Sequence, residues 1–222
     1  MGDLLKCVKR DVGWPERKAL HFKDLKHDNR EVAVRLLTKD KSLFRAISVM
    51  VHKPCLSNPE AFQQQNRLYF YFTRYVLERA SWLCRDSREG KNPQQGDGTA
   101  KVIFSSMNEV SKVRISEYFA HLQSLDTEID WRVIKGDQFE TLTPGRHAGL
   151  QIADCIAAGF YCTGHHCERK KTDRWADLLR PVIYRSPRGK YRGYGLKIFP
   201  SETEKQIAQG AIAPWANVLF PK

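Results

Sequence analysis

Residues 149–160 read Gly-Leu-Gln-Ile-Ala-Asp-Cys-Ile-Ala-Ala-Gly-Phe, which predicts an apolar helix of small residues with one carboxylate, Asp154, in its middle. Leu150 and Gln151 lie one turn before Asp154, and Ala157 lies one turn after it. Such a face packs closely against another element, where an isolated buried carboxylate would cost several kcal/mol. The sequence therefore predicts that Asp154 is paired with a cation, protonated or bound to a metal. It is either a structural ion pair at the rim of the core or a catalytic, metal-binding group.

The length of 222 residues and the hydrophobic content of 41% allow one sizeable core. We expect a single domain over residues 1–200 and a C-terminal tail over 201–222. No apolar run approaches the roughly 18 residues that cross a bilayer, and the basic N-terminus has no stretch of the signal-peptide kind. These features predict a cytoplasmic protein without a membrane partner.

Helical and strand patterns alternate along the chain, which predicts an α/β (α+β) domain with a mixed sheet flanked by helices. Signatures of phosphate-loop proteins, dinucleotide-binding folds and Gly-x-Ser-x-Gly hydrolases are absent from the sequence. The helices are expected over residues 4–10, 28–37, 58–83, 110–122, 149–160 and 173–179, and the strands over residues 43–51, 101–104, 129–134, 182–184 and 194–199.

The charge is strongly basic, with Lys+Arg of 37 against Asp+Glu of 25 and a net charge of +12. Nine Lys or Arg residues lie between Arg169 and Arg192, interleaved with Trp175, Tyr184 and Tyr191. A phosphate backbone is the natural partner of such a stretch, although basic proteins also exist for solubility alone. The predicted nucleic-acid-binding residues are Lys170, Lys171, Arg174, Arg188, Lys190 and Arg192.

The cysteines are irregularly spaced, and we interpret them as reduced thiols that behave as small hydrophobes. The segment from Cys162 to Cys167 also contains His165 and His166, and together with Cys155 it offers nitrogen and sulfur ligands that zinc prefers. A structural zinc site usually has a second ligand pair, which this chain lacks. The alternative is a helix end where the histidines cap the last carbonyl groups.

Four segments occur in an order that is typical of one family: Leu-His-Phe-Lys-Asp-Leu at 20–25, Ser-Val-Met-Val-His-Lys at 48–53, Gly-Leu-Gln-Ile-Ala-Asp at 149–154 and Tyr-Arg-Gly-Tyr-Gly-Leu-Lys-Ile at 191–198. Together they resemble the DUF3800 family of uncharacterised proteins, which is thought to have a ribonuclease H-like fold. The resemblance covers about residues 15–200, and the string at 149–154 is its most specific part.

The resemblance implies metal-dependent hydrolysis of phosphodiester bonds by clustered carboxylates. Such sites hold two divalent ions roughly 4 Å apart, and Mg²⁺ or Mn²⁺ is expected because the ligands are oxygen atoms. Asp154 matches the carboxylate of the family's last motif, Gln151 accompanies it, and His21 matches a histidine of an earlier motif. These three residues are the predicted catalytic group.

Two departures from the family pattern affect the metal site. The chain lacks the Asp-Glu-Ser-Gly strand whose aspartate is the expected first ligand, so we expect that the N-terminal strands of the fold are missing. The strand ending at Phe104 should also deliver an acidic residue, but the next one, Glu109, comes about five residues late. Asp154 and Glu109 are therefore the candidate metal ligands.

Three functional hypotheses follow. The first is a metal-dependent nuclease-like protein that acts on RNA or DNA. The second is a catalytically inactive member of the same family that binds nucleic acid through its basic stretch. The third is an interaction subunit whose open sheet edge is completed by a protein partner or by a second copy of the chain.

Overall fold

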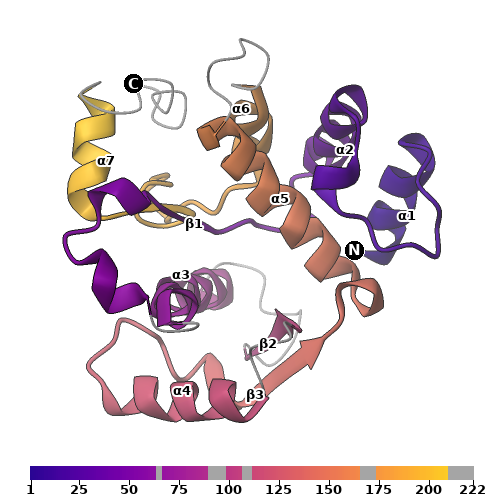
Figure 1. The fold of residues 1–222 in the computed structure, drawn as a ribbon. Helices are drawn as coiled ribbons and strands as arrows, with labels where there is room; N and C mark the ends of the chain where they lie inside the picture. Colours follow the sequence, from indigo (N-terminus) through magenta and orange to yellow (C-terminus); the bar gives the residue numbers. More distant parts are fainter. Residues whose placement is uncertain (64–66, 90–98, 107–111, 166–173, 210–222) are drawn as a thin grey trace.

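The computed structural model describes residues 1–63, 67–89, 99–106, 112–165 and 174–209. Within these ranges the chain forms seven α-helices and four short strands (Figure 1). The helices are α1 (Gly2–Asp11), α2 (His27–Lys39), α3 (Arg67–Glu89), α4 (Lys112–Ser124), α5 (Ala148–His165), α6 (Arg174–Leu179) and α7 (Ser201–Ala208). The strands are β1 (Ser48–Val51), β2 (Ala100–Ser105), β3 (Ile134–Leu142) and β4 (Leu196–Phe199). The predicted mixture of helices and strands is confirmed.

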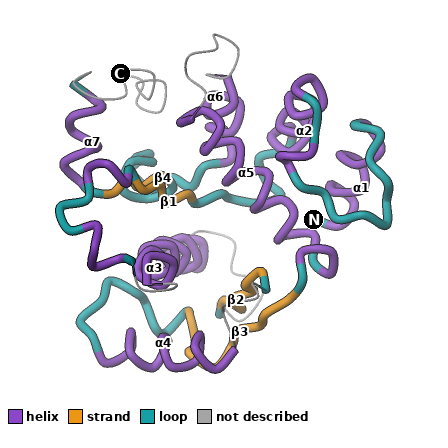
Figure 2. Tube along the Cα trace, in the orientation of Figure 1, coloured by secondary structure: helices purple, strands orange, loops and turns teal. Residues whose placement is uncertain are grey.

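The strands of the described residues pair in two separate parallel sheets, whereas the sequence predicted one mixed sheet (Figure 2). In the first sheet β1 pairs with β4, in a register that places Ser48 opposite Leu196. In the second sheet β2 pairs with β3, and the register shifts between Ala100 and Val102. Helix α5 contacts both β1 and β2, so it connects the two sheets.

The buried side chains form two cores. The large core lies among α1, α2, α5, α6 and β4 and contains Phe22, Ile152, Phe160 and Leu179. The small core lies among α3, α4 and β3, with Phe119 near its centre. Helix α3 runs between the β1–β4 sheet and α4 (Figure 1). The first residues of the predicted tail form α7, whose Ile207 is buried in the large core.

Side chains explain two of the element predictions that are wrong. Residues 129 and 130 form no strand and residues 131–133 form a turn, because the carboxylate of Asp130 accepts the backbone N–H of Arg132 at 3.1 Å. The strand begins only where the predicted one ended, at Ile134. The helix expected from Asn58 begins at Arg67 instead. Asn58 caps a separate 3₁₀ turn, where its side chain accepts the N–H of Ala61 at 3.2 Å.

The predicted strand at 182–184 is reduced to a single parallel bridge between Ile183 and Ala46.

In the described part of the chain, no helix has the length and apolar character needed to span a membrane.

Candidate functional site

The candidate site lies where α5 contacts the 3₁₀ turn Phe22–Asp24 and the residues just before it. Gln151 is only 3% exposed, and its side chain bridges two backbone segments. Its Oε1 accepts the N–H of Leu20 at 2.8 Å, and its Nε2 donates to the carbonyl oxygen of Pro144 at 3.1 Å. Because the amide supplies one acceptor and one donor, both partners are satisfied. Gln151 therefore holds the backbone at Leu20 and the backbone at Pro144 against α5.

Asp154 lies one turn further along α5, on the same side as Gln151. Its Oδ2 accepts the N–H of Phe22 at 3.2 Å and lies 3.6 Å from Nδ1 of His21. The Asp154 and His21 side chains are 43% and 37% exposed. Asp154 therefore lies beside a histidine, and it is half-exposed where the sequence suggested a buried group. A solvent-facing carboxylate of this kind is accessible to a ligand.

Phe22 anchors the segment beside Asp154. Its side chain is fully buried, and its ring meets that of Trp175 edge-on with 5.0 Å between the centroids. The guanidinium of Arg30 lies 5.5 Å above the Phe22 ring, and its Nε donates to the Phe22 carbonyl oxygen at 3.1 Å. Because Phe22 is held in the core, the preceding His21 is held at the surface next to Asp154.

Close packing against α6 holds α5 in place. A Cβ at Gly159 would lie 2.8 Å from Cδ1 of Leu179, so the glycine allows α5 and α6 to approach closely. Cys155, next to Asp154, is fully buried. Burial, with a smaller contribution from the Asp154 charge, raises the pKa of the Cys155 thiol to about 12.

The structure describes only some of the predicted metal ligands. Among the described residues, no three His, Cys, Asp or Glu side chains are grouped as a metal site would require. Asp154 and His21 come together, while Glu109 lies outside the described residues. Of the candidate zinc ligands, Cys155 and Cys162 are free thiols on α5. His166 and Cys167 fall outside the described residues, and His165 ends α5.

The predicted nucleic-acid-binding residues are only partly described. Arg188, Lys190 and Arg192 are exposed in residues 185–192, which we call the basic loop. A turn shapes this loop: Gly189, with φ of 78°, donates its N–H to the carbonyl oxygen of Ser186 at 2.8 Å. Arg174 begins α6, and Lys170 and Lys171 lie outside the described residues.

Sequence reasoning did not identify Tyr161 as a site residue. It lies seven residues after Asp154, so it shares the solvent-facing side of α5, and it is 60% exposed. An exposed aromatic ring two turns from the Asp154 carboxylate offers a surface on which a planar group could stack. The signal available in the sequence was its spacing of seven from Asp154, but the predicted helix ended one residue earlier, at Phe160.

Comparison of the chain with protein-family models, curated proteins and solved structures finds no match.

Proposed function

We propose that the protein is a nuclease-like protein of the DUF3800 type, with a ribonuclease H-like ancestry, that binds nucleic acid and hydrolyses phosphodiester bonds at Asp154. The observation that carries this proposal is the half-exposed Asp154 carboxylate, held by a backbone N–H and lying 3.6 Å from His21. Two segments that carry the family resemblance, 20–25 and 149–154, contact one another through hydrogen bonds of Gln151 and Asp154. This contact supports a shared functional role for them.

The Asp154 carboxylate fits one divalent ion. Its Oδ1 accepts no hydrogen bond from the described residues, and Mg²⁺ commonly binds proteins through one or two carboxylates while keeping several waters. Asp154 would hold Mg²⁺ or Mn²⁺, with Glu109 as the second candidate ligand. A bound ion would polarise the phosphate and acidify water. The described residues do not supply the carboxylate cluster that a pair of ions requires.

His21 and Gln151 have separate roles in this proposal. With Nδ1 of His21 directed to Oδ2 of Asp154, Nε2 is left to accept a proton from the attacking water. The 3.6 Å separation is longer than a hydrogen bond, as is common for catalytic contacts in ligand-free sites. Gln151 is a positioning residue, because it holds the backbone of Leu20 immediately before His21.

A cleavage assay tests the proposal. Labelled single-stranded RNA and DNA are incubated with the protein in Mg²⁺, in Mn²⁺ or in EDTA. Asp154→Asn should lower the rate by about a hundredfold or more, whereas Asp3→Asn should leave it unchanged because Asp3 is fully exposed on α1. Cleavage that persists in EDTA, or an Asp154→Asn variant with full activity, would contradict the proposal.

A second candidate is a protein that binds nucleic acid without cleaving it. The observation that favours it is that one carboxylate, Asp154, and no further one is brought to His21 among the described residues. Affinity should then fall steeply with salt while no product forms. Charge reversal at Arg188 and Lys190 should weaken binding, and each lost phosphate contact should reduce the logarithmic salt slope by about 0.7 for a single strand. Unchanged affinity in the reversed variant would rule this candidate out.

A further inference from the structure

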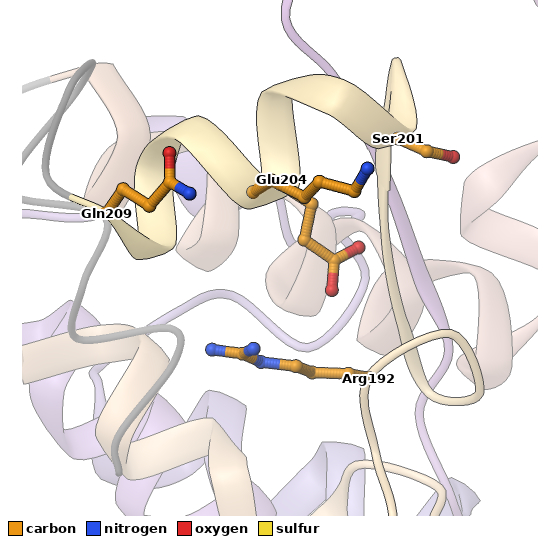
Figure 3. A pocket seen from close by; sticks show the side chains of 5 residues that line it. Arg192, Ser201, Glu204 and Gln209 are labelled. Carbon is orange, nitrogen blue, oxygen red and sulfur yellow. The ribbon is translucent and has the colours of Figure 1, made fainter.

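A depression of about 420 Å³ lies along α7 and is lined by Arg192, Ser201, Glu204, Lys205 and Gln209. Figure 3 shows the carboxylate of Glu204 pointing from α7 toward the side chain of Arg192. Because Arg192 opposes the rise in pKa that burial causes at Glu204, the two opposite charges stabilise one another. The depression therefore indicates no charged ligand, and a reactive pair of side chains lies elsewhere, at the end of β1.

This pair consists of His52 and Cys55. Nδ1 of His52 lies 3.0 Å from Sγ of Cys55, within hydrogen-bonding distance for a sulfur atom. One tight turn joins the two residues, and in it the N–H of Cys55 donates to the carbonyl oxygen of His52 at 3.1 Å. Pro54 lies inside this turn, and its ring restricts the backbone further. The local backbone therefore holds the thiol against the imidazole.

The first sheet holds the histidine in turn. The N–H of His52 donates to the carbonyl oxygen of Phe199 at 2.9 Å, which extends the pairing of β1 with β4 by one residue. Cys55 is partly exposed, whereas Cys155 is buried. From residue 41 to residue 59 the sequence contains cations but no aspartate or glutamate. A thiol with a base in contact and positive charge nearby has the surroundings that are typical of a reactive cysteine.

We propose that Cys55 is a modification site that exchanges with low-molecular-weight disulfides such as glutathione disulfide, with His52 as its base. In the tautomer that carries its proton on Nε2, His52 accepts the thiol proton at Nδ1. The Cys55 thiolate then attacks one sulfur of the disulfide and forms a new S–S bond with it. The original S–S bond breaks, and the other half leaves as a thiolate that takes the proton from the imidazolium. The step consumes one disulfide and releases one thiol, and it does not depend on hydrolysis at Asp154.

The test compares cysteines within one chain. The protein is incubated with glutathione disulfide, samples are quenched with acid at intervals, and the mixed disulfide at each cysteine is measured by mass spectrometry of the peptides. Cys7 is exposed on α1 near Arg10, so it controls for access and for a neighbouring positive charge. Cys55 should react about tenfold faster than Cys7, although it is less exposed. Dithiothreitol should then remove the modification.

Two variants separate the role of His52 as a base from a general effect of substitution. His52→Gln keeps a side chain that forms hydrogen bonds but does not accept the proton, so the rate at Cys55 should fall to that of Cys7 or below. His121→Gln, on the exposed side of α4, should leave the rate at Cys55 unchanged. Cys155 is fully buried, so its modification would reveal a variant that has unfolded.

Two results would overturn the proposal. One is a wild-type Cys55 that reacts no faster than Cys7. The other is a His52→Gln variant that keeps the wild-type rate at Cys55 while Cys155 stays unmodified. If His52→Gln unfolds, the comparison of Cys55 with Cys7 in the wild-type protein decides the question alone. Asp154→Asn should show the wild-type rates, which keeps this result separate from the proposed function.

Discussion

Replacement of Gln151 by methionine tests whether this residue holds the segment that carries His21. Methionine has nearly the same volume and keeps the packing, but it removes both hydrogen bonds of the side-chain amide. The N–H of Leu20 would then be left without a partner in a fully buried position. The carbonyl oxygen of Pro144 lies on a half-exposed residue, so water can replace its lost donor.

The expected loss of stability follows from the different surroundings of the Leu20 N–H and the Pro144 carbonyl oxygen. An unsatisfied buried N–H costs about 1–3 kcal/mol, and a lost but rehydrated hydrogen bond costs about 0.5–1 kcal/mol. Gln151→Met should therefore lower the free energy of unfolding by about 2–3 kcal/mol. Urea denaturation followed by tryptophan fluorescence measures it. Trp14 is a suitable probe because its Nε1 donates to the carbonyl oxygen of Ala19, beside the affected segment.

Two variants serve as controls. Gln123→Met, on the exposed side of α4, should stay within about 0.5 kcal/mol of the wild type. Gln151→Glu keeps the acceptor for Leu20 and supplies a donor to Pro144 only while protonated, so its stability relative to the wild type should improve as the pH falls. If Gln151→Met costs no more than Gln123→Met, or if amide exchange at Leu20 is no faster, Gln151 does not hold this segment.

Three further predictions concern the rest of the chain. Gly195→Ala should destabilise the fold by roughly 1–3 kcal/mol in the same urea assay, because the added Cβ would lie 2.3 Å from the carbonyl oxygen of Tyr184. Glu78→Gln should cost about 3–5 kcal/mol, because it leaves the guanidinium of Arg79, only 6% exposed, without its charged partner. Cys155 should resist iodoacetamide at neutral pH, as measured by mass spectrometry, because burial blocks access and its raised pKa leaves little thiolate.

Matched controls make each of these three results decisive. Gly2→Ala should be neutral, because no atom lies within 4 Å of the added Cβ. Glu202→Gln removes an exposed ion pair with Lys205 and should cost less than about 1 kcal/mol. Cys7 is exposed and should be alkylated readily. A variant that matches its control, or a Cys155 that reacts as fast as Cys7, would contradict the corresponding argument.

Local sequence patterns predicted most elements but failed where a side chain competes for the backbone. The buried-type strand predicted at 101–104 and the amphipathic helix predicted at 110–122 correspond to β2 and α4, and the small-residue helix at 149–160 lies within α5. The strand prediction at 129–134 was wrong because the Asp130 side chain accepts the backbone N–H of Arg132, which a strand would have donated to its neighbour. Apolar alternation alone does not reveal that competition.

The candidate site was likewise predictable only in part from the sequence. Asp154 and Gln151 are recognisable in the sequence because polar groups interrupt an apolar helix, and their spacing of three places them on one face. The partners of these side chains are not recognisable, because Leu20 and Phe22 lie 131 and 132 residues away along the chain. Periodicity carries no information about a contact at that separation.

Composition and short-range pattern were enough to determine the α/β character, the basic charge and the polar interruption of one apolar helix, because each depends on residues within a few turns of one another. Tertiary packing alone decided that the strands of the described residues pair in two parallel sheets and that Asp154 remains half-exposed beside His21. It also decided that Arg192 and Glu204 meet at one depression. The physical reason is that side-chain burial and charge balance depend on which distant segments pack together, and that choice is made by the whole core.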